Sequence, residues 1–213
     1  MTEFDYQWKN LPSEFIEYNG YRMIEFNMFT MLPQGFLKGK EALDAGCGNG
    51  RYTYAMQELG AKVKSIDVSG EAVKACKKIN PNTQQMSLLD LSGKQYDFIL
   101  CWGVLHHIEK PQEGFSVLVN QLKKGGMLHL MLYEKKTQEI YKDLRKEFKT
   151  LDEAGKIAMC KRLGKNIHGW YDALNPKYNH SFVVEDIIKW YEDAGFKDIS
   201  IASTASININ GIK

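Results

Sequence analysis

The sequence predicts an α/β protein with a doubly wound, mostly parallel sheet of seven strands, and three observations carry this prediction. From residue 40 onward, short extended apolar runs alternate with stretches of helical period, which is the pattern of βαβ units. The run YDFILCW, residues 96–102, is apolar enough for a central strand that is covered on both faces. A glycine loop, GCGNG, directly follows the first extended run, where open parallel sheets place a ligand-binding turn.

Each element follows from its own local pattern. The strands are short extended runs bounded by turn or helix signals, and we expect them at residues 41–45, 62–67, 84–88, 96–102, 127–133, 197–204 and 206–213. The helices have apolar residues at helical spacing, and we expect them at residues 51–59, 71–79, from Pro111 onward, and at 183–194. Gly60 and Gly195 should end the first and last of these helices, because glycine readily takes the left-handed conformation of a helix C-terminus. Asn80 and Pro81 end the second helix.

Two segments lie outside this alternation. Residues 1–38 are rich in aromatic side chains, and we expect a helical N-terminal flap there, ahead of a main domain at residues 39–213. Residues 134–180 are longer than a strand-to-helix connection needs, so we expect a substrate-binding insertion after the fifth strand. The aromatic residues of the flap could close over a ligand or pack against the sheet edge, and they are Phe4, Tyr6, Trp8, Phe15, Tyr18 and Tyr21.

Composition and charge exclude several classes of function. The chain has 213 residues and a formal net charge of +2, which gives no large basic field for a phosphate backbone, so a nucleic-acid partner is not expected. The four cysteines form no CxxC pair, and the five histidines have no metal-ligand spacing, so we expect neither a metal site nor a disulfide framework. The cysteine usage fits a reducing cytoplasm, and the absence of a long apolar run predicts no membrane span.

The glycine loop distinguishes between possible ligands. A dinucleotide-binding fingerprint would read GxGxxG, whereas the glycines here are Gly46, Gly48 and Gly50, and Arg51 follows them. Asp67 closes the second predicted strand, where a carboxylate can accept hydrogen bonds from both hydroxyls of a ribose. These features predict an adenosine-like ligand whose other end needs close approach to the backbone.

Four motifs in the same order and spacing carry a family resemblance. They are DAGCGNG after a strand, Asp67 at the end of the next strand, YDFILCWGVLHHI, and LKKGGMLHLMLY. With them the chain resembles the class I S-adenosylmethionine-dependent methyltransferases over residues 40–133 and the C-terminal helix and strands. FDYQW and WYDALNPKY add a likeness to a bacterial subgroup that methylates small molecules.

The resemblance implies a Rossmann-like methyltransferase fold, S-adenosyl-L-methionine as cofactor, and S-adenosyl-L-homocysteine as product. It implies methyl transfer to an oxygen or nitrogen of a small molecule, such as a sugar, a phosphorylated compound or a secondary-metabolite intermediate. The implied cofactor-binding positions are Asp44, Gly46, Cys47, Gly48, Gly50, Arg51, Asp67, Val68, Ser87, Leu88, Cys101 and Trp102.

Within this set, each part of the sequence would contact a different part of the cofactor. The glycine loop would lie under the methionine part, and Asp67 would bind the ribose, with Val68 beside the adenine. Ser87 stands where the family often has an aspartate for the adenine amine. Arg51 could pair with the methionine carboxylate or be a solvated residue of the first helical turn.

A general base is needed only if the acceptor must lose a proton. His106 and His107 are the first candidates because histidine titrates near neutrality, although either could instead pack or cap the turn VLHHI. His180, Tyr171 and Tyr178 of the insertion follow them, and the weaker candidates are His168, Glu134 and Tyr133. The insertion has eleven Lys or Arg and seven Asp or Glu, which fits either an anionic acceptor or a solvated helix face.

Three other functions stay open at this point. One is methylation of RNA or protein, although NPKY at residues 175–178 is expected to be a turn and the base-stacking NPPY motif is missing after the fourth strand. A second is a non-catalytic subunit that binds S-adenosylmethionine. The third is a nicotinamide oxidoreductase, which Arg51 disfavours.

Overall fold

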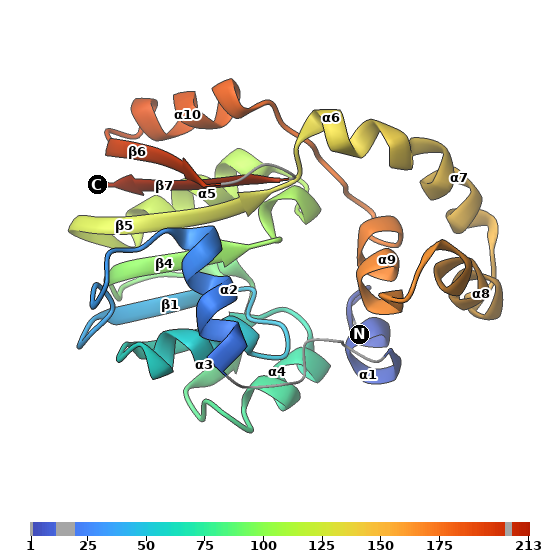
Figure 1. Ribbon diagram of the computed structural model, residues 1–213, viewed down its shortest axis with the longest axis horizontal. Helices are drawn as coiled ribbons and strands as arrows, with labels where there is room; N and C mark the ends of the chain where they lie inside the picture. The colour runs from blue at the N-terminus through green and yellow to red at the C-terminus, as the bar shows by residue number, and fades with distance from the viewer. Residues whose placement is uncertain (1, 12–19, 203–205) are drawn as a thin grey trace.

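The computed structural model describes residues 2–11, 20–202 and 206–213, and its centre is one twisted sheet (Figure 1). The strand order is β3-β2-β1-β4-β5-β7-β6. The strands are β1 (Glu41–Ala45), β2 (Lys62–Asp67), β3 (Thr83–Gln85), β4 (Tyr96–Trp102), β5 (Leu122–Leu132), β6 (Lys197–Ala202) and β7 (Ile207–Ile212). β1 to β5 are parallel, while β7 runs antiparallel to both of its neighbours. The predicted doubly wound, mostly parallel sheet of seven strands is confirmed.

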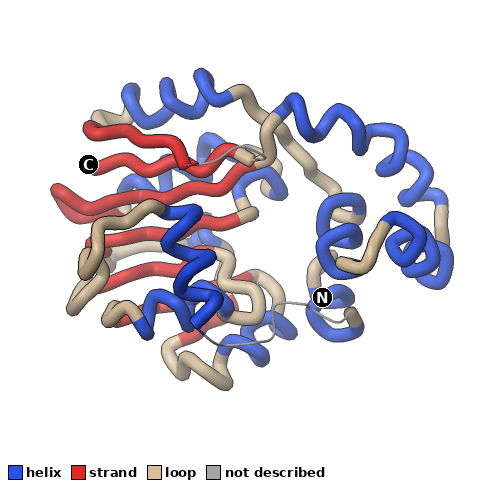
Figure 2. Tube along the Cα trace, viewed as in Figure 1, coloured by secondary structure: helices blue, strands red, loops and turns tan. Residues whose placement is uncertain are grey.

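Helices cover both faces of the sheet (Figure 2). They are α1 (Asp5–Asn10), α2 (Gly20–Thr30), α3 (Arg51–Glu58), α4 (Gly70–Cys76), α5 (Pro111–Asn120), α6 (Lys135–Gln138), α7 (Lys142–Thr150), α8 (Glu153–Leu163), α9 (Ile167–Leu174) and α10 (Val184–Asp193). Successive strand residues point to opposite faces. Leu43 and Ile99 therefore lie in one core with the residues of α5 and α10, whereas Phe98 and Leu100 lie in a second core with α2 and α3.

Two strand boundaries differ from the prediction by three residues or more, and several others differ by one. The expected end of the sixth strand at Thr204 lies outside the described residues. The third strand ends at Gln85 instead of Leu88, because Ser87 caps a short 3-10 turn and its Oγ accepts the Leu89 N–H at 3.2 Å. The fifth strand begins at Leu122 instead of Met127. Leu122 pairs with Tyr96 of β4 and Met127 pairs with Phe98, so the register shifts between these two pairs. Residues 123–126 are therefore an irregularity within β5 and not a separate turn before it.

The insertion, residues 134–180, has a small core of its own. Its helices α7 to α9 bury five apolar side chains together, Phe148, Met159, Cys160, Tyr171 and Leu174. The N-terminal helix α1 joins this core, because the ring of Tyr6 stacks on Tyr171 at 5.5 Å. Figure 1 shows α1 and α9 side by side, facing the ends of the strands. Phe15 and Tyr18, two of the aromatic residues predicted for the flap, lie outside the described residues.

Candidate active site

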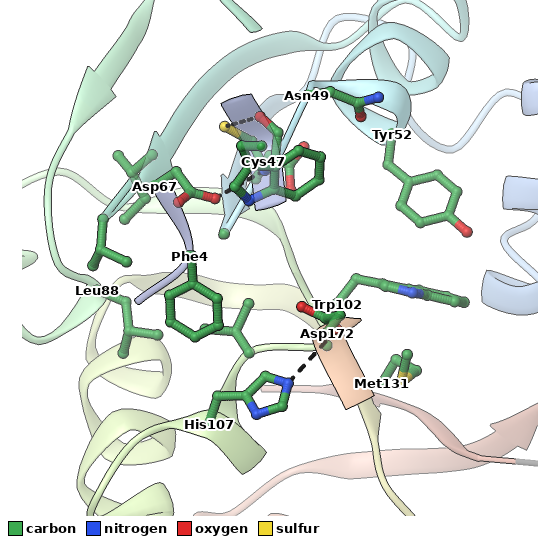
Figure 3. Close-up of a pocket in the computed structure, with 18 of the residues that line it drawn as sticks. Phe4, Cys47, Asn49, Tyr52, Asp67, Leu88, Trp102, His107, Met131 and Asp172 are labelled. Carbon is green, nitrogen blue, oxygen red and sulfur yellow. Dashed lines mark hydrogen bonds and ion pairs between the residues drawn. The ribbon is translucent and has the colours of Figure 1, made fainter. Parts of the chain in front are cut away.

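A cavity of about 250 Å³ lies at the carboxyl ends of β1, β2 and β4. The sheet and its loops supply its floor, and Phe4, Gln7 and Trp8 of the N-terminal segment line it together with His168 and Asp172 of α9 (Figure 3). Helix α1 is tied to the main domain as well, because the Ser69 hydroxyl donates a 2.6 Å hydrogen bond to the Asp5 carboxylate. The cavity is therefore bounded by three segments that are far apart in the sequence.

The glycine loop needs its glycines for different reasons. Gly46 and Gly48 line the cavity with φ of 92° and 53°, values that other residues rarely adopt. A Cβ on Gly46 would lie 2.1 Å from Cγ2 of Val104, and one on Gly48 would lie 2.6 Å from the Trp8 ring. Gly50 lies outside the cavity lining, and a Cβ there would come within 2.8 Å of the Cys76 sulfur. Gly50 thus lets α3 pack closely against α4.

Two buried carboxylates face the cavity from the ends of β1 and β2. Asp67 accepts hydrogen bonds from the backbone N–H of Gly48 at 2.9 Å and of Ser69 at 2.8 Å. Asp44 accepts one from the Thr53 hydroxyl at 2.6 Å. Burial raises the pKa of Asp67 to about 6 and that of Asp44 to about 7, because a charge in this environment loses its hydration. Both carboxylates would be stabilised by a ligand that brings positive charge or hydroxyl donors.

Most of the other predicted cofactor positions line the same cavity. Cys47, Arg51, Val68, Ser87, Leu88 and Trp102 line it. Arg51 lies with its guanidinium 4.5 Å from the centre of the Tyr52 ring. Cys101 is a neighbour of Trp102 on β4, but it points away from the cavity into the core with α5 and α10.

Of the two first candidates for the base, His107 lines the cavity, as do the weaker candidates His168 and Tyr133. Nδ1 of His107 lies 3.0 Å from the carbonyl oxygen of Tyr178, which can only accept, so Nδ1 carries the hydrogen of the neutral ring. Nε2 then has a free lone pair, and it lies 3.8 Å from Oδ2 of Asp172, as the dashed line in Figure 3 marks. The sequence alone left open whether His107 packs or reacts. In the structure its side chain lines the cavity, and its Nε2 is buried without a hydrogen-bond partner among the described residues.

His106 has a different environment from its neighbour. It is fully buried and outside the cavity lining, and burial lowers the pKa of its imidazole. Its ring stacks on Tyr133 at 3.6 Å, and its Nδ1 accepts the Tyr133 N–H. His106 therefore positions Tyr133, which does line the cavity and whose pKa is raised by burial and by the nearby Asp172.

The remaining candidates of the insertion are spread over several places. The Tyr171 hydroxyl donates to Glu153 at 2.9 Å within the core of the insertion. Tyr178 reaches His107 through its backbone carbonyl, while its ring stacks with His180 at 5.9 Å. His180 lines a separate groove beside Trp190, and none of these three lines the cavity. Glu134 pairs with Phe182 in an isolated strand bridge away from it.

Sequence reasoning missed two polar residues of the site. Asp172 of α9 and Gln7 of α1 both line the cavity, and the Gln7 amide donates to Asp172 Oδ1 at 2.7 Å. One local signal was available, since Asp172 follows His168 by four residues and so lies on the same face of α9. Nothing in the local sequence connects either residue with His107.

The lysines and arginines that the structure describes in the insertion lie outside the cavity lining. Several of them pair with acidic neighbours at the surface, as Lys142 does with Glu139 and Arg162 with Glu147. Arg145 donates to the carbonyl oxygen of Ala173 inside the insertion. Of the charged side chains that the structure describes in the insertion, only Asp172 lines the cavity.

The fold and the site define a class of protein: an open α/β sheet whose first loop and second strand form a cradle for an adenosine-like cofactor. Residues 15–201 match the methyltransferase domain family. The chain belongs to this family of methyltransferase domains. The family match sets aside the nicotinamide alternative.

Relatives and solved structures agree with this assignment. The chain is 25% identical over 175 residues to the ubiquinone biosynthesis O-methyltransferase of Coxiella burnetii, an alignment that covers 78% of this chain and 67% of the relative. Among solved structures, the magnesium protoporphyrin IX methyltransferase from Synechocystis with bound S-adenosylmethionine has a TM-score of 0.62 at 18% identity, covering 99% of this chain and 89% of that one. The 1,6-didemethyltoxoflavin-N1-methyltransferase of Burkholderia thailandensis has a TM-score of 0.55 at 16% identity, covering 92% and 83%.

The chain spans only part of the length of some curated relatives. One alignment covers 25% of the relative, and the alignment with the Coxiella burnetii protein covers 67%. The likeness to the solved structures shows the fold. No helix in the described residues is long and apolar enough to cross a bilayer. The described residues also contain no group of three His, Cys, Asp or Glu placed to hold a metal.

The residues of the cavity fit the cofactor of the family. S-adenosylmethionine has a positive sulfonium and ammonium as well as two ribose hydroxyls, and the cavity offers the buried carboxylates of Asp44 and Asp67 to such groups. The cradle at Gly46 and Gly48 leaves no room for side chains.

Proposed function

We propose that this enzyme transfers the methyl group of S-adenosylmethionine to an oxygen or nitrogen of a small-molecule acceptor, with His107 as general base. The observation that carries the proposal is the position of His107. Its side chain lines the cavity at 4% exposure, with the ring of Phe4 5.8 Å away, and its Nε2 has no hydrogen-bond partner among the described residues. A base in such a position serves an acceptor that is small enough to be enclosed.

Different residues of the cavity would bind the cofactor and take the proton from the acceptor. Asp44, the glycine loop and Asp67 would bind the cofactor, which supplies an electrophilic methyl group when bound. His107 would take the proton that the acceptor loses, and Tyr178 would keep the ring in the tautomer with a free Nε2. Helices α1 and α9 would exclude water and hold the acceptor close to the reacting methyl group. We place this reaction in the cytoplasm, where free thiols such as those of its four cysteines persist.

The alternatives differ from this proposal in the size of the acceptor and in the need for a base. An RNA or protein substrate would have to insert one residue past α1 and α9, next to a cavity with three carboxylates. A non-catalytic subunit would bind the cofactor without using His107. We favour a small-molecule acceptor because Nε2 of His107 has no hydrogen-bond partner among the described residues that would explain its position.

Methyl transfer from labelled S-adenosylmethionine tests the proposal directly. The purified protein is incubated separately with low-molecular-mass metabolites, with bulk tRNA and with a protein extract. We expect label in the metabolite fraction only. Label in tRNA or protein would replace the small-molecule reading, and a protein that binds the cofactor but labels nothing would support the non-catalytic alternative.

Asp67→Ala is expected to weaken binding of S-adenosylmethionine by about 1.5–3 kcal/mol, which is roughly 10- to 150-fold, because hydrogen bonds to a charged group are lost. The same change leaves the Gly48 and Ser69 N–H groups without their acceptor, so the melting temperature should fall as well. Isothermal titration calorimetry measures the affinity. Asp67→Asn is the matched variant, since it keeps an acceptor for the backbone, and an unchanged affinity in both variants would contradict this site for the ribose.

Affinity for S-adenosylmethionine should rise with pH between about 5 and 8. The pKa values of Asp67 and Asp44 are raised to about 6 and about 7, so both carboxyls hold a proton at low pH and release it as the pH rises. A cationic ligand favours the charged forms, and binding near pH 6.5 should therefore release protons. Titration in buffers of different ionisation enthalpy measures this release. Asp44→Asn should remove the upper part of the rise, and a pH-independent affinity would contradict the assignment.

A further inference from the structure

We propose that the methyl acceptor is an amine, which enters the cavity as an ammonium ion and binds between Asp172 and His107. This inference rests on the proposed function and specifies its substrate class. It starts from two hydrogen-bond acceptors that face each other with no donor between them.

The first acceptor is Nε2 of His107. Because Nδ1 donates to the Tyr178 carbonyl, the neutral ring has only a lone pair at Nε2, which has no hydrogen-bond partner among the described residues. The second acceptor is Oδ2 of Asp172, 3.8 Å away. When His107 is neutral, neither atom can donate to the other. A primary ammonium group has three N–H donors, enough to satisfy both acceptors at once.

The Asp172 carboxylate is held in place for this role. Gln7 of α1 donates to its Oδ1 at 2.7 Å, which leaves Oδ2 on the side of His107. The Asp172 side chain is 33% exposed, so a ligand in the cavity can reach it. Burial alone would raise the pKa of this carboxyl, but the net shift of its pKa is downward, and the hydrogen bond from Gln7 is one of the causes that lower it. Asp172 is therefore negatively charged near neutral pH.

The surroundings favour a cation over the other acceptor types. The rings of Phe4 and Tyr133 lie 5.8 Å and 5.5 Å from the His107 ring and line the same cavity, and aromatic faces attract an ammonium group. An anionic acceptor would be repelled by Asp172, and no lysine or arginine of the insertion lines the cavity to offset this repulsion. A neutral hydroxyl would offer one hydrogen to two acceptors.

The reaction that follows is balanced in protons and electrons. The ammonium ion gives one proton to Nε2 of His107, and the resulting imidazolium faces the negative charge of Asp172. The nitrogen lone pair of the free amine forms a bond to the methyl carbon while the bond from that carbon to sulfur breaks, and its electron pair stays on sulfur. The products are an N-methylammonium ion and S-adenosylhomocysteine, and His107 returns its proton to water.

Three matched probes test this inference: benzylamine, benzyl alcohol and benzoate, titrated at pH 7.5 into the protein saturated with S-adenosylhomocysteine. We expect benzylamine to bind at least tenfold more tightly than benzyl alcohol, and benzoate to bind most weakly. Asp172→Asn should remove this preference for the amine, while Asp172→Glu should restore part of it. Asp143→Asn is the charge-matched control, since Asp143 is an exposed carboxylate of α7 outside the cavity.

With S-adenosylmethionine in place of the product, mass spectrometry should find N-methylbenzylamine. The inference is overturned if the alcohol binds as tightly as the amine, if Asp172→Asn weakens both equally, or if none of the probes binds to a protein that S-adenosylhomocysteine stabilises against heat. If the alcohol alone is methylated, the proposed function stands and the amine inference fails. If S-adenosylhomocysteine causes no stabilisation, the proposed function itself fails.

Discussion

His107→Gln is expected to lower kcat by about 10²- to 10⁴-fold and to leave the affinity for S-adenosylmethionine nearly unchanged. Glutamine keeps polar atoms near the Tyr178 carbonyl and Asp172, but it cannot take a proton at neutral pH. Initial rates at saturating cofactor measure kcat, and titration calorimetry measures the affinity.

The pH profile separates a base from a structural residue. A general base makes the rate rise with pH, so the wild-type enzyme should show such a rise and the variant should lose it. His180→Gln is the matched control, because His180 lies in the separate groove beside Trp190 and should not affect the rate. If His107→Gln turned over at the wild-type rate, His107 would be a packing residue and the base would have to be sought elsewhere in the cavity.

Gly46→Ala is expected to destabilise the protein by about 2–6 kcal/mol and to abolish cofactor binding at ordinary concentrations. Part of this cost is the strain of a side chain at φ 92°, about 1–3 kcal/mol. The rest comes from overlap, since the new Cβ would lie 2.1 Å from Cγ2 of Val104 and would push the loop after β4 out of place, at about 1–3 kcal/mol. Thermal unfolding should show a fall in Tm of roughly 4–24 °C for a chain of this size.

Two further variants separate strain from overlap. Gly35 has φ 77° and no atom within 4 Å of an added Cβ, so Gly35→Ala reports the strain alone. Gly46→Ala combined with Val104→Ala removes most of the overlap and should recover part of the lost stability. Equal destabilisation by Gly35→Ala and Gly46→Ala would show that close approach to Val104 is unimportant.

Most of the sheet could be predicted because its signals are local. The alternation of apolar residues in β4, the stop signal at Gly60 and the glycine loop each depend on neighbours within a few positions. The two boundary errors also have local causes that compete with the strand pattern. Ser87 uses its hydroxyl to cap a turn, and the residues before Met127 stay in the ladder through a register shift.

The catalytic side of the cavity could be predicted only in part. In the sequence, the adjacent residues His106 and His107 were equally good candidates for the base. Only the packing around each ring distinguishes them. His106 faces Tyr133 in the core, whereas His107 meets the carbonyl of a residue 71 positions away. Asp172 and Gln7 had no local signal that connects them with a base, and their mutual hydrogen bond spans 165 positions.

By itself, the sequence determined the α/β class, the place of the glycine loop and the acidic end of β2, because backbone propensity and side-chain alternation act between near neighbours. The tertiary structure decided that α1 and α9 enclose the cavity, that His107 rather than His106 faces it, and that Asp172 stands opposite. These features depend on the path of the chain through space, since the packing of Tyr6 on Tyr171 and of Trp8 on His168 brings the ends of distant segments to one place.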